Sequence, residues 1–221
     1  HLIICLNVIC GRYNREGDLV ESGNFLSPDS PRLAQVIPAK DPTPGPPSRF
    51  RNLRGYRGQM PCSTLADEIL EPGEGQIRAL IVSGGNPVVA FPDQELTMSA
   101  LKDLDLLVVL DHRMTATAEL ADYIFAPRLA LERADVPHLM DRWFAAPYTN
   151  YTDAVVEAEP ELIAEWEFFW EIACRMNTPI ALSGGELPLD HKPTDDEVID
   201  LVYSESRMPM DQIRENRGII H

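Results

Sequence analysis

The sequence predicts an α/β fold: a Rossmann-like, doubly wound, mostly parallel sheet with helices on both faces and a long proline-rich connection. Two apolar runs, Ile77–Val82 and Leu106–Leu110, have the length and composition of buried strands. The segment between them has apolar residues at helical spacing, and a third short apolar run follows at Tyr123–Ala126. The order strand, helix, strand, helix, strand is typical of parallel strands joined by right-handed crossovers.

The N-terminal part predicts one apolar helix and one irregular segment. The helix covers His1–Cys10, with Gly11 as its cap. Proline density then excludes helix and sheet interiors over residues 27–61 and predicts a long surface connection. The prolines are Pro28, Pro31, Pro38, Pro42, Pro44, Pro46, Pro47 and Pro61.

The helices of the predicted sheet region have recognisable starts. Ser63 is the expected N-cap of a helix over Thr64–Leu70, and Pro92-Asp93 starts a helix that continues to Leu104. Thr115 is the expected cap of a short helix that ends at Ala121.

The C-terminal part predicts further helices. The alternating segment Arg142–Val156 is expected to be a strand or hairpin, and Glu161–Met176 a helix with one broad apolar, aromatic face. Asp195–Val202 is a shorter helix, and from Tyr203 the chain is expected to be polar and peripheral.

These elements predict four parts along the chain. They are an N-terminal helix and loop (1–24), the proline-rich connection (25–61), an α/β cofactor-binding core (62–156) and a C-terminal helical extension (157–221).

Composition narrows the class of function. The chain has 221 residues and a formal net charge of -16, which disfavours nucleic acid and anionic membrane surfaces as partners. No apolar run approaches the roughly 20 residues of a membrane span, and no signal peptide precedes the first helix. We expect a cytoplasmic protein, and the start at His1 suggests a piece of a longer one.

The sequence contains no recognisable catalytic or metal-binding constellation. Cys5, Cys10, Cys62 and Cys174 form no Cys-x-x-Cys pair, so we expect buried, reduced thiols. No two histidines stand four residues apart, and no Gly-x-Ser-x-Gly elbow exists. We therefore assign no catalytic residue and no metal ligand.

Two strand ends carry the candidate binding residues, because parallel sheets hold ligands at the carboxyl ends of their strands. Gly84 and Gly85 let a backbone approach a phosphate or base closely, and Asn86 offers a donor and an acceptor. A simple strand-to-helix turn is the alternative, because neither Gly-x-Gly-x-x-Gly nor a Walker loop is present.

The second strand ends in Asp111-His112-Arg113. Asp111 could accept hydrogen bonds from a ribose or from guanine N–H groups, and Arg113 could meet a phosphate. The alternatives are an N-terminal cap or solvated turn for Asp111, and a surface position for Arg113.

Both runs resemble the molybdopterin oxidoreductases, the family that holds a bis-molybdopterin guanine dinucleotide cofactor. The first is Ile77–Pro87, which ends in Ser-Gly-Gly-Asn-Pro; the second begins at Leu106–Asp111 and continues through Met114–Pro127 to Glu132. Weaker resemblance covers Leu6–Asp18 and the helix around Trp166–Met176.

The resemblance implies that this α/β domain contacts the guanosine and pyrophosphate of one pterin cofactor. The residues that match are Gly84, Gly85, Asn86 and Asp111, with His112 and Arg113 adjacent. It implies molybdopterin guanine dinucleotide, with molybdenum and an iron–sulfur cluster in the full enzyme. It also implies the remaining domains of the parent enzyme as partners. Independently of the resemblance, the aromatic helix with Trp166 and Trp170 makes a homodimer through an exposed interdomain surface a further option.

Departures from the family limit the expected activity. The chain has no iron–sulfur cysteine run, no residue that matches the molybdenum ligand and no C-terminal barrel domain. We therefore expect a fragment of a molybdenum-dependent oxidoreductase that binds part of the cofactor and is not catalytically complete alone. The alternative is a non-catalytic α/β interaction or scaffold module without cofactor.

Overall fold

The computed structural model describes residues 2–19, 25–28, 45–56, 58–138, 140–142 and 148–216. The chain divides into two compact units, and each is described by itself. Unit 1 comprises His1–Pro38, Ala130–Val156 and Trp170–His221, and unit 2 comprises Ala39–Leu129 and Glu157–Phe169.

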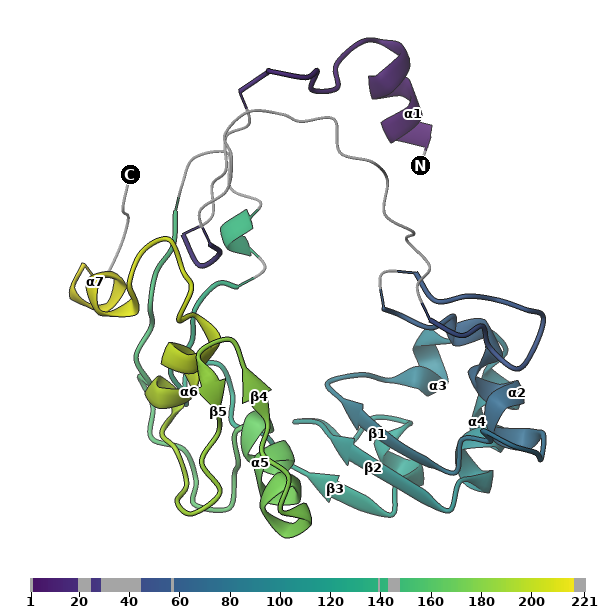
Figure 1. The fold of residues 1–221 in the computed structure, drawn as a ribbon. Helices are drawn as coiled ribbons and strands as arrows, with labels where there is room; N and C mark the ends of the chain where they lie inside the picture. The colour runs from purple at the N-terminus through teal and green to yellow at the C-terminus, as the bar shows by residue number, and fades with distance from the viewer. Residues whose placement is uncertain are drawn as a thin grey trace. The chain divides into compact units, whose positions relative to one another are not determined.

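Unit 2 contains a three-stranded parallel sheet (Figure 1). Its strands are β1 (Ala79–Ser83), β2 (Leu106–Leu110) and β3 (Tyr123–Phe125), in the order β1-β2-β3. The mixed α/β class and the parallel pairing are confirmed. The doubly wound arrangement stays a prediction, because these three strands follow one another without the reversal of order that defines it.

Helices α2 (Leu65–Leu70), α3 (Pro87–Ala90) and α4 (Gln94–Asp103) lie in the same unit. The predicted start of α4 is confirmed, because the Asp93 side chain accepts a hydrogen bond from the Leu96 N–H at 3.1 Å. The short helix α3 was not predicted and follows directly from the turn after β1. It places Asn86 between a strand end and a helix start.

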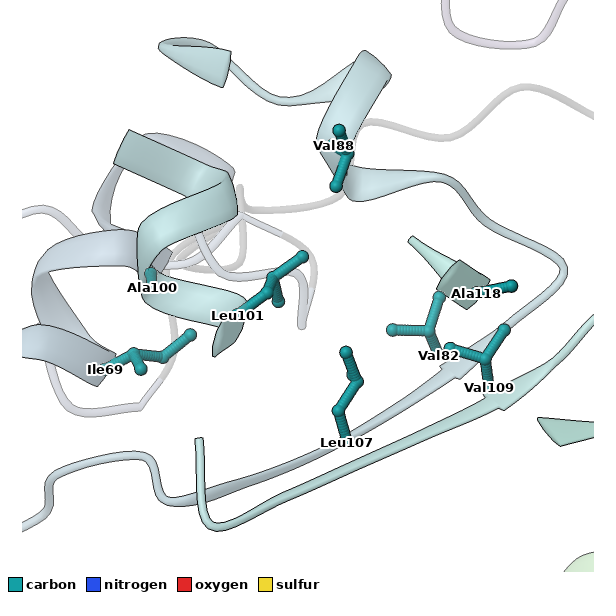
Figure 2. Close-up of a cluster of buried hydrophobic side chains, with 8 residues drawn as sticks. All are labelled: Ile69, Val82, Val88, Ala100, Leu101, Leu107, Val109 and Ala118. Atoms are coloured by element: carbon teal, nitrogen blue, oxygen red, sulfur yellow. The ribbon is translucent and has the colours of Figure 1, made fainter. Parts of the chain in front are cut away.

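The core of unit 2 lies between these helices and one face of the sheet. Figure 2 shows Val88 and Leu101, on helices, with Val82, Leu107 and Val109 on the strands. Ile69, Ala100 and Ala118 complete the cluster. Leu107 is 1% exposed and Val109 is fully buried, so the middle strand supplies the centre of this core.

Burial on both faces distinguishes β2 from β1. Leu107, Val108, Val109 and Leu110 are all buried, and alternate residues of a strand point to opposite faces. The expectation that the first strand is buried like the second is wrong, because Ile81 of β1 is 44% exposed. The first strand lies at an edge of the three-stranded sheet, where fewer groups cover it.

Two predicted helix starts in unit 2 need correction. Ser63 is not the cap of α2, because it lies inside a 3-10 turn, Cys62–Thr64, that precedes the helix. The predicted helix Thr115–Ala121 is reduced to a 3-10 turn at Ala118–Leu120. The Thr115 hydroxyl still accepts a hydrogen bond from the Ala118 N–H at 3.2 Å.

Helix α5 (Glu165–Met176) begins later than the predicted Glu161. Glu161 lies in a turn, in which the Leu162 N–H donates to the Glu159 carbonyl at 3.0 Å. Ile163 then forms a parallel bridge with Pro127 directly after β3. The Arg128 N–H donates to the Ile163 carbonyl at 2.8 Å. This bridge fixes the start of α5 beside the carboxyl end of β3.

Unit 1 contains α1 (Leu2–Ile9), α6 (Asp195–Val202), α7 (Met210–Glu215) and the two-residue strands β4 (Ala181–Leu182) and β5 (Gly185–Glu186). The predicted cap of α1 is confirmed, since Gly11 follows the helix at a φ of +66°. None of the helices in the described residues is long and apolar enough to cross a membrane.

The expectation of a polar, peripheral chain after Tyr203 is wrong. Tyr203, Met210 and Ile213 are buried together with Leu26 and Val136 in a second core. The expected strand or hairpin at Arg142–Val156 is also wrong over the described residues 148–156, where a single bridge joins Thr152 to Asp135. Residues 143–147, and residues 29–44 and 57 of the proline-rich connection, lie outside the described residues.

The cysteines are free thiols, but the expected burial is wrong. Cys5, Cys10 and Cys62 are exposed, and Cys174 is half-buried. In particular, Cys5 lies in α1, in which no residue is buried.

A buried carboxylate joins distant segments of unit 1. Asp141 is fully buried, and its two oxygens accept the N–H groups of Phe25 and Leu26 at 3.1 Å each. We expect Asp141→Ala to lower the free energy of unfolding by about 3 kcal/mol, because it leaves two buried donors without acceptors. Asp190→Ala, which removes an exposed carboxylate of the same unit, is the control for urea-induced unfolding.

The same carboxylate predicts a pH dependence. Burial raises the pKa of Asp141 above its usual 3.8, and the two amide hydrogen bonds partly oppose that rise. The folded state therefore binds the proton more readily than the unfolded state between the usual and the raised pKa. The stability advantage of the wild type over Asp141→Ala should decrease as the pH rises through this window, and an advantage that grows would contradict the account.

Candidate functional site

The carboxyl ends of the three strands lie level at one edge of the sheet. Ser83 pairs with Leu110, and Leu110 pairs with Phe125. The Gly84 N–H donates to the Leu110 carbonyl at 2.9 Å, and the Asp111 N–H donates to the Phe125 carbonyl at 3.2 Å. The glycine turn and the aspartate predicted from the sequence therefore occupy neighbouring strand ends.

The backbone at Gly84 is open on one side. Its φ is +60°, a left-handed conformation that favours glycine. A Cβ atom built there would meet no heavy atom closer than Glu165 Oε1, at 4.0 Å. Within the described residues the N–H groups of Gly85 and Asn86 have no hydrogen-bond acceptor, so they are available to a ligand.

A second Ser-Gly-Gly sequence provides an internal comparison. Gly184, in the turn between β4 and β5, would place a Cβ atom 2.8 Å from the Ser204 Cβ and 2.9 Å from the Leu201 carbonyl oxygen. Glycine is required there by close packing inside the protein. At Gly84 no such packing exists, so the space beside it can admit another molecule.

The Asn86 side chain is oriented by Thr117. The Thr117 hydroxyl accepts the Val88 N–H at 3.1 Å and donates to Asn86 Oδ1 at 2.8 Å. Because its proton is directed at Asn86, the carbonyl end of that amide faces Thr117. Asn86 therefore presents its NH₂ group, a hydrogen-bond donor, away from Thr117.

We expect Thr117→Val to lower the free energy of unfolding by about 2 kcal/mol, because the buried Val88 N–H loses its acceptor. Thr117 is fully buried, and valine has nearly its shape. Thr117→Ser, which keeps the hydroxyl, is the matched control for urea-induced unfolding. Equal stability of the valine and serine variants would contradict this role of the hydroxyl.

Asp111 is 9% exposed, and only one of its two carboxylate oxygens accepts a hydrogen bond within the described residues. Its Oδ1 accepts the Arg113 N–H at 3.0 Å, which forms the local turn that was the alternative interpretation. Among the described residues no hydrogen bond reaches Oδ2. The carboxylate thus holds its own turn and keeps one oxygen for a donor.

The two residues after Asp111 are exposed. His112 Nδ1 lies 3.8 Å from Asp111 Oδ1, and its side chain is 53% exposed. Arg113 is exposed as well. The structure therefore places both residues next to the aspartate, on the solvent side.

Sequence reasoning missed two further residues at this edge. Ser83 Oγ donates to Glu165 Oε1 at 2.9 Å, although 82 positions separate them. No local sequence pattern predicts this contact, because the contact depends on where α5 begins. Thr117 was also missed, although its place in the Met-Thr-Ala-Thr-Ala run was a signal.

The arrangement combines acceptors and donors suited to a nucleotide. Asp111 accepts, whereas the Asn86 side chain and the backbone at Gly85 donate. The described residues contain no group of three or more His, Cys, Asp or Glu side chains that could hold a metal ion. The donors and acceptors at this edge fit an organic ligand that has both kinds of group.

Comparison with known proteins points to one family. The family model described as "Molybdopterin oxidoreductase" matches residues 3–175. Acetylene hydratase of Syntrophotalea acetylenica is 33% identical over 100 residues, which is 45% of this chain and 13% of that protein. Formate dehydrogenase H of Escherichia coli (strain K12) is 31% identical over 106 residues, which is 48% of this chain and 14% of that protein.

A solved structure agrees with these sequence matches. Acetylene hydratase from Pelobacter acetylenicus superimposes with a TM-score of 0.57 and 25% identity, and the match covers 73% of this chain and 21% of that one. The chain thus spans a small part of the relatives that it matches. Because the family model covers most of its 221 residues, the chain belongs to the molybdopterin oxidoreductase family.

Proposed function

We propose that the sheet edge formed by Gly84, Gly85, Asn86 and Asp111 binds the guanine-nucleotide part of a molybdopterin guanine dinucleotide cofactor. Membership of the family implies a molybdopterin cofactor with molybdenum. The observation that carries the guanine assignment is the pair of opposite polarities at this edge. Asp111 keeps an acceptor oxygen, and Thr117 orients Asn86 as a donor.

Guanine complements this pair better than adenine does. Guanine has adjacent N1–H and N2–H donors that a carboxylate can accept, and O6 and N7 acceptors for an amide NH₂ group. Adenine presents an acceptor, N1, at the position of the guanine N1–H, and it would face the Asp111 carboxylate with a lone pair.

Few groups on this acidic chain could bind the phosphates of the cofactor. The N–H groups of Gly85 and Asn86 are uncharged donors, and Arg113 is an exposed cation next to Asp111. We assign the pyrophosphate to these groups, because backbone N–H groups hold phosphates without a surplus of positive charge. His112 remains at the rim of the site.

In this proposal the chain supplies binding and orientation. The bound cofactor supplies the oxidation–reduction chemistry of molybdenum. The chain is not catalytically complete alone, and the remaining domains of a parent enzyme are its partners. A doubly wound sheet, completed beyond the three described strands, belongs to the same proposal.

The burial of aromatic residues on α5 weakens the alternative of an interaction module without cofactor. An exposed aromatic face on α5 with Trp166 and Trp170 would favour such a module. Trp170 is 7% exposed, and its Nε1–H donates to the Pro188 carbonyl at 2.6 Å. Trp166 is half-buried. Phe169, which is 41% exposed, remains as an exposed aromatic residue on this helix.

Calorimetric titration with GDP, IDP and ADP tests the proposal. IDP lacks the exocyclic N2 amine of guanine, and ADP presents the wrong polarity to Asp111. We expect GDP to bind in the micromolar to millimolar range, IDP about tenfold more weakly and ADP more weakly still. Equal binding of GDP and ADP, or no GDP binding at millimolar concentration, would contradict the proposal.

A further inference from the structure

A cavity in unit 2 lies beside helix α2 and is lined by none of the residues of the proposed nucleotide site. Its volume is about 200 Å³. The segment before α2 contributes Met60 and Cys62, α2 contributes Leu65, and Ile77 and Phe91 complete the apolar part of the wall. Met60 is 55% exposed and Cys62 is exposed as well, so the cavity opens to solvent on their side.

The protein already engages the hydroxyl and the carboxylate in the wall of this cavity. Thr64 Oγ1 donates to the Pro61 carbonyl at 3.0 Å. Glu68 Oε1 accepts the Arg49 N–H at 2.9 Å, and Glu68 Oε2 lies 3.4 Å from Arg49 Nε. Both side chains belong to buried residues. A charged ligand would find no partner in this wall, and burial of an unpaired charge is costly, so the cavity favours an uncharged ligand.

The size and the chemistry of the wall match a single aromatic ring. An apolar cavity of about 150 Å³ lined by leucine, isoleucine and phenylalanine binds benzene, and the cavity beside α2 is somewhat larger. Its wall combines the ring of Phe91 with the sulfur-containing side chains of Met60 and Cys62. Rings and sulfur atoms attract an aromatic ring beyond the effect of apolar contact alone. The wall therefore favours an aromatic molecule over a saturated one of equal size.

Contacts within unit 2 hold the cavity in shape before a ligand binds. A Cβ atom at Gly55 would lie 3.2 Å from the Met60 sulfur, so the absence of a side chain there lets Met60 pack closely. The Ile77 N–H donates to the Glu68 carbonyl at 3.0 Å, which ties two sides of the wall together. Leu65 and Ile77 also pack against the buried core. A preformed site of this kind binds its ligand with little ordering cost.

We propose that the cavity beside α2 is a second binding site, which takes a small uncharged molecule with one aromatic ring. The site does not depend on the proposed function, because the two sites share no residue and the aromatic ligand needs no nucleotide.

Methyl nuclear magnetic resonance of the full chain during titration with benzene tests this site. The methyl signals of Leu65 and Ile77 should shift saturably, because the ring current of bound benzene acts on them, with a Kd of about 0.1 to 1 mM. Val109 and Ile213 are buried but do not line the cavity, so their methyl signals should not respond. Cyclohexane should bind about threefold more weakly than benzene, and benzoate should not bind at the same concentrations.

A pair of matched variants tests the contribution of the aromatic wall. Phe91→Leu removes the ring but keeps an apolar side chain, and it should reduce the preference for benzene over cyclohexane to about one. Phe50→Leu changes another half-buried phenylalanine of unit 2 that does not line the cavity, and it should keep the preference of the wild type. Thermal unfolding of each variant checks that the fold is intact.

The possible outcomes separate a specific site from general partition into the core. Saturable shifts at Leu65 and Ile77, with none caused by benzoate, would support the site. The proposal would be overturned by the absence of saturable shifts up to the solubility of benzene, by equal shifts at Val109 and Ile213, or by equal binding of benzoate. Loss of the benzene preference in both phenylalanine variants would equally contradict it.

Discussion

Replacing Asp111 with asparagine is expected to weaken GDP binding about a hundredfold and to abolish the preference for GDP over IDP. Asp111 Oδ2, the oxygen that the local turn leaves free, has two lone pairs and would accept both adjacent guanine donors, and each charge-assisted hydrogen bond contributes about 1.5 kcal/mol or more. Asparagine presents an NH₂ group in place of one acceptor oxygen, so it meets a guanine donor with a donor. Calorimetric titration of both nucleotides measures the change.

The fold should survive this substitution. Asp111 Oδ1 accepts the Arg113 N–H, and the asparagine carbonyl can accept the same hydrogen bond. Asp103→Asn, an exposed carboxylate at the end of α4, is the control and should bind GDP as the wild type does. Unchanged GDP affinity in a folded Asp111→Asn variant would remove the guanine assignment.

Replacing Leu107 with alanine is expected to lower the free energy of unfolding of unit 2 by about 3 kcal/mol. Leu107 is 1% exposed and lies in the centre of the core between β2 and the helices (Figure 2). Its removal leaves a cavity against Leu101 and Val109, which are themselves buried. Hydrogen exchange of the sheet amides in increasing urea measures the loss within this unit.

The adjacent residue is a matched control for the core. Leu106 lies on the same strand and is 37% exposed. We expect Leu106→Ala to cost less than about 1 kcal/mol, because it opens no enclosed cavity. Similar losses in the two variants would mean that β2 is not the centre of the core. Because β2 carries Asp111 at its end, Leu107→Ala should also weaken GDP binding.

The sheet could be predicted because its strands have local signals. The apolar runs of β1 and β2 end at Gly84 and Asp111, and the segment between them is long enough for a parallel crossover. The extra helix α3 has no separate signal, because it is only four residues long. The position of β1 at an edge depends on strand order, which apolar content does not encode.

The second core, in unit 1, has a signal in the sequence, but the many polar residues after Tyr203 make it hard to recognise. Met210 and Ile213 stand three residues apart directly after Pro209. This pattern is typical of the start of a helix with one apolar face. Their burial depends on contact with Leu26 and Val136, far away in the sequence. The acidic residues of the surrounding segment therefore outweighed the few apolar ones in the prediction.

The candidate site also has residues that the sequence predicts and contacts that it does not predict. Gly84, Gly85, Asn86 and Asp111 could be named from the sequence, because residue type and position at strand ends were enough. The hydrogen bonds from Thr117 to Asn86 and from Ser83 to Glu165 span 31 and 82 positions. Contacts of that separation follow from the packing of elements, so only the structure reveals them.

Nuclear magnetic resonance of the ¹⁵N-labelled chain during titration with GDP tests the central claim most directly. The amide signals of Gly84, Gly85 and Asn86 should shift together with that of Asp111. The second Ser-Gly-Gly turn, with Gly184 and Gly185, is the internal control and should not respond, because Gly184 is closely packed. Shifts at the second turn with none at Gly84–Asn86 and Asp111 would contradict the account.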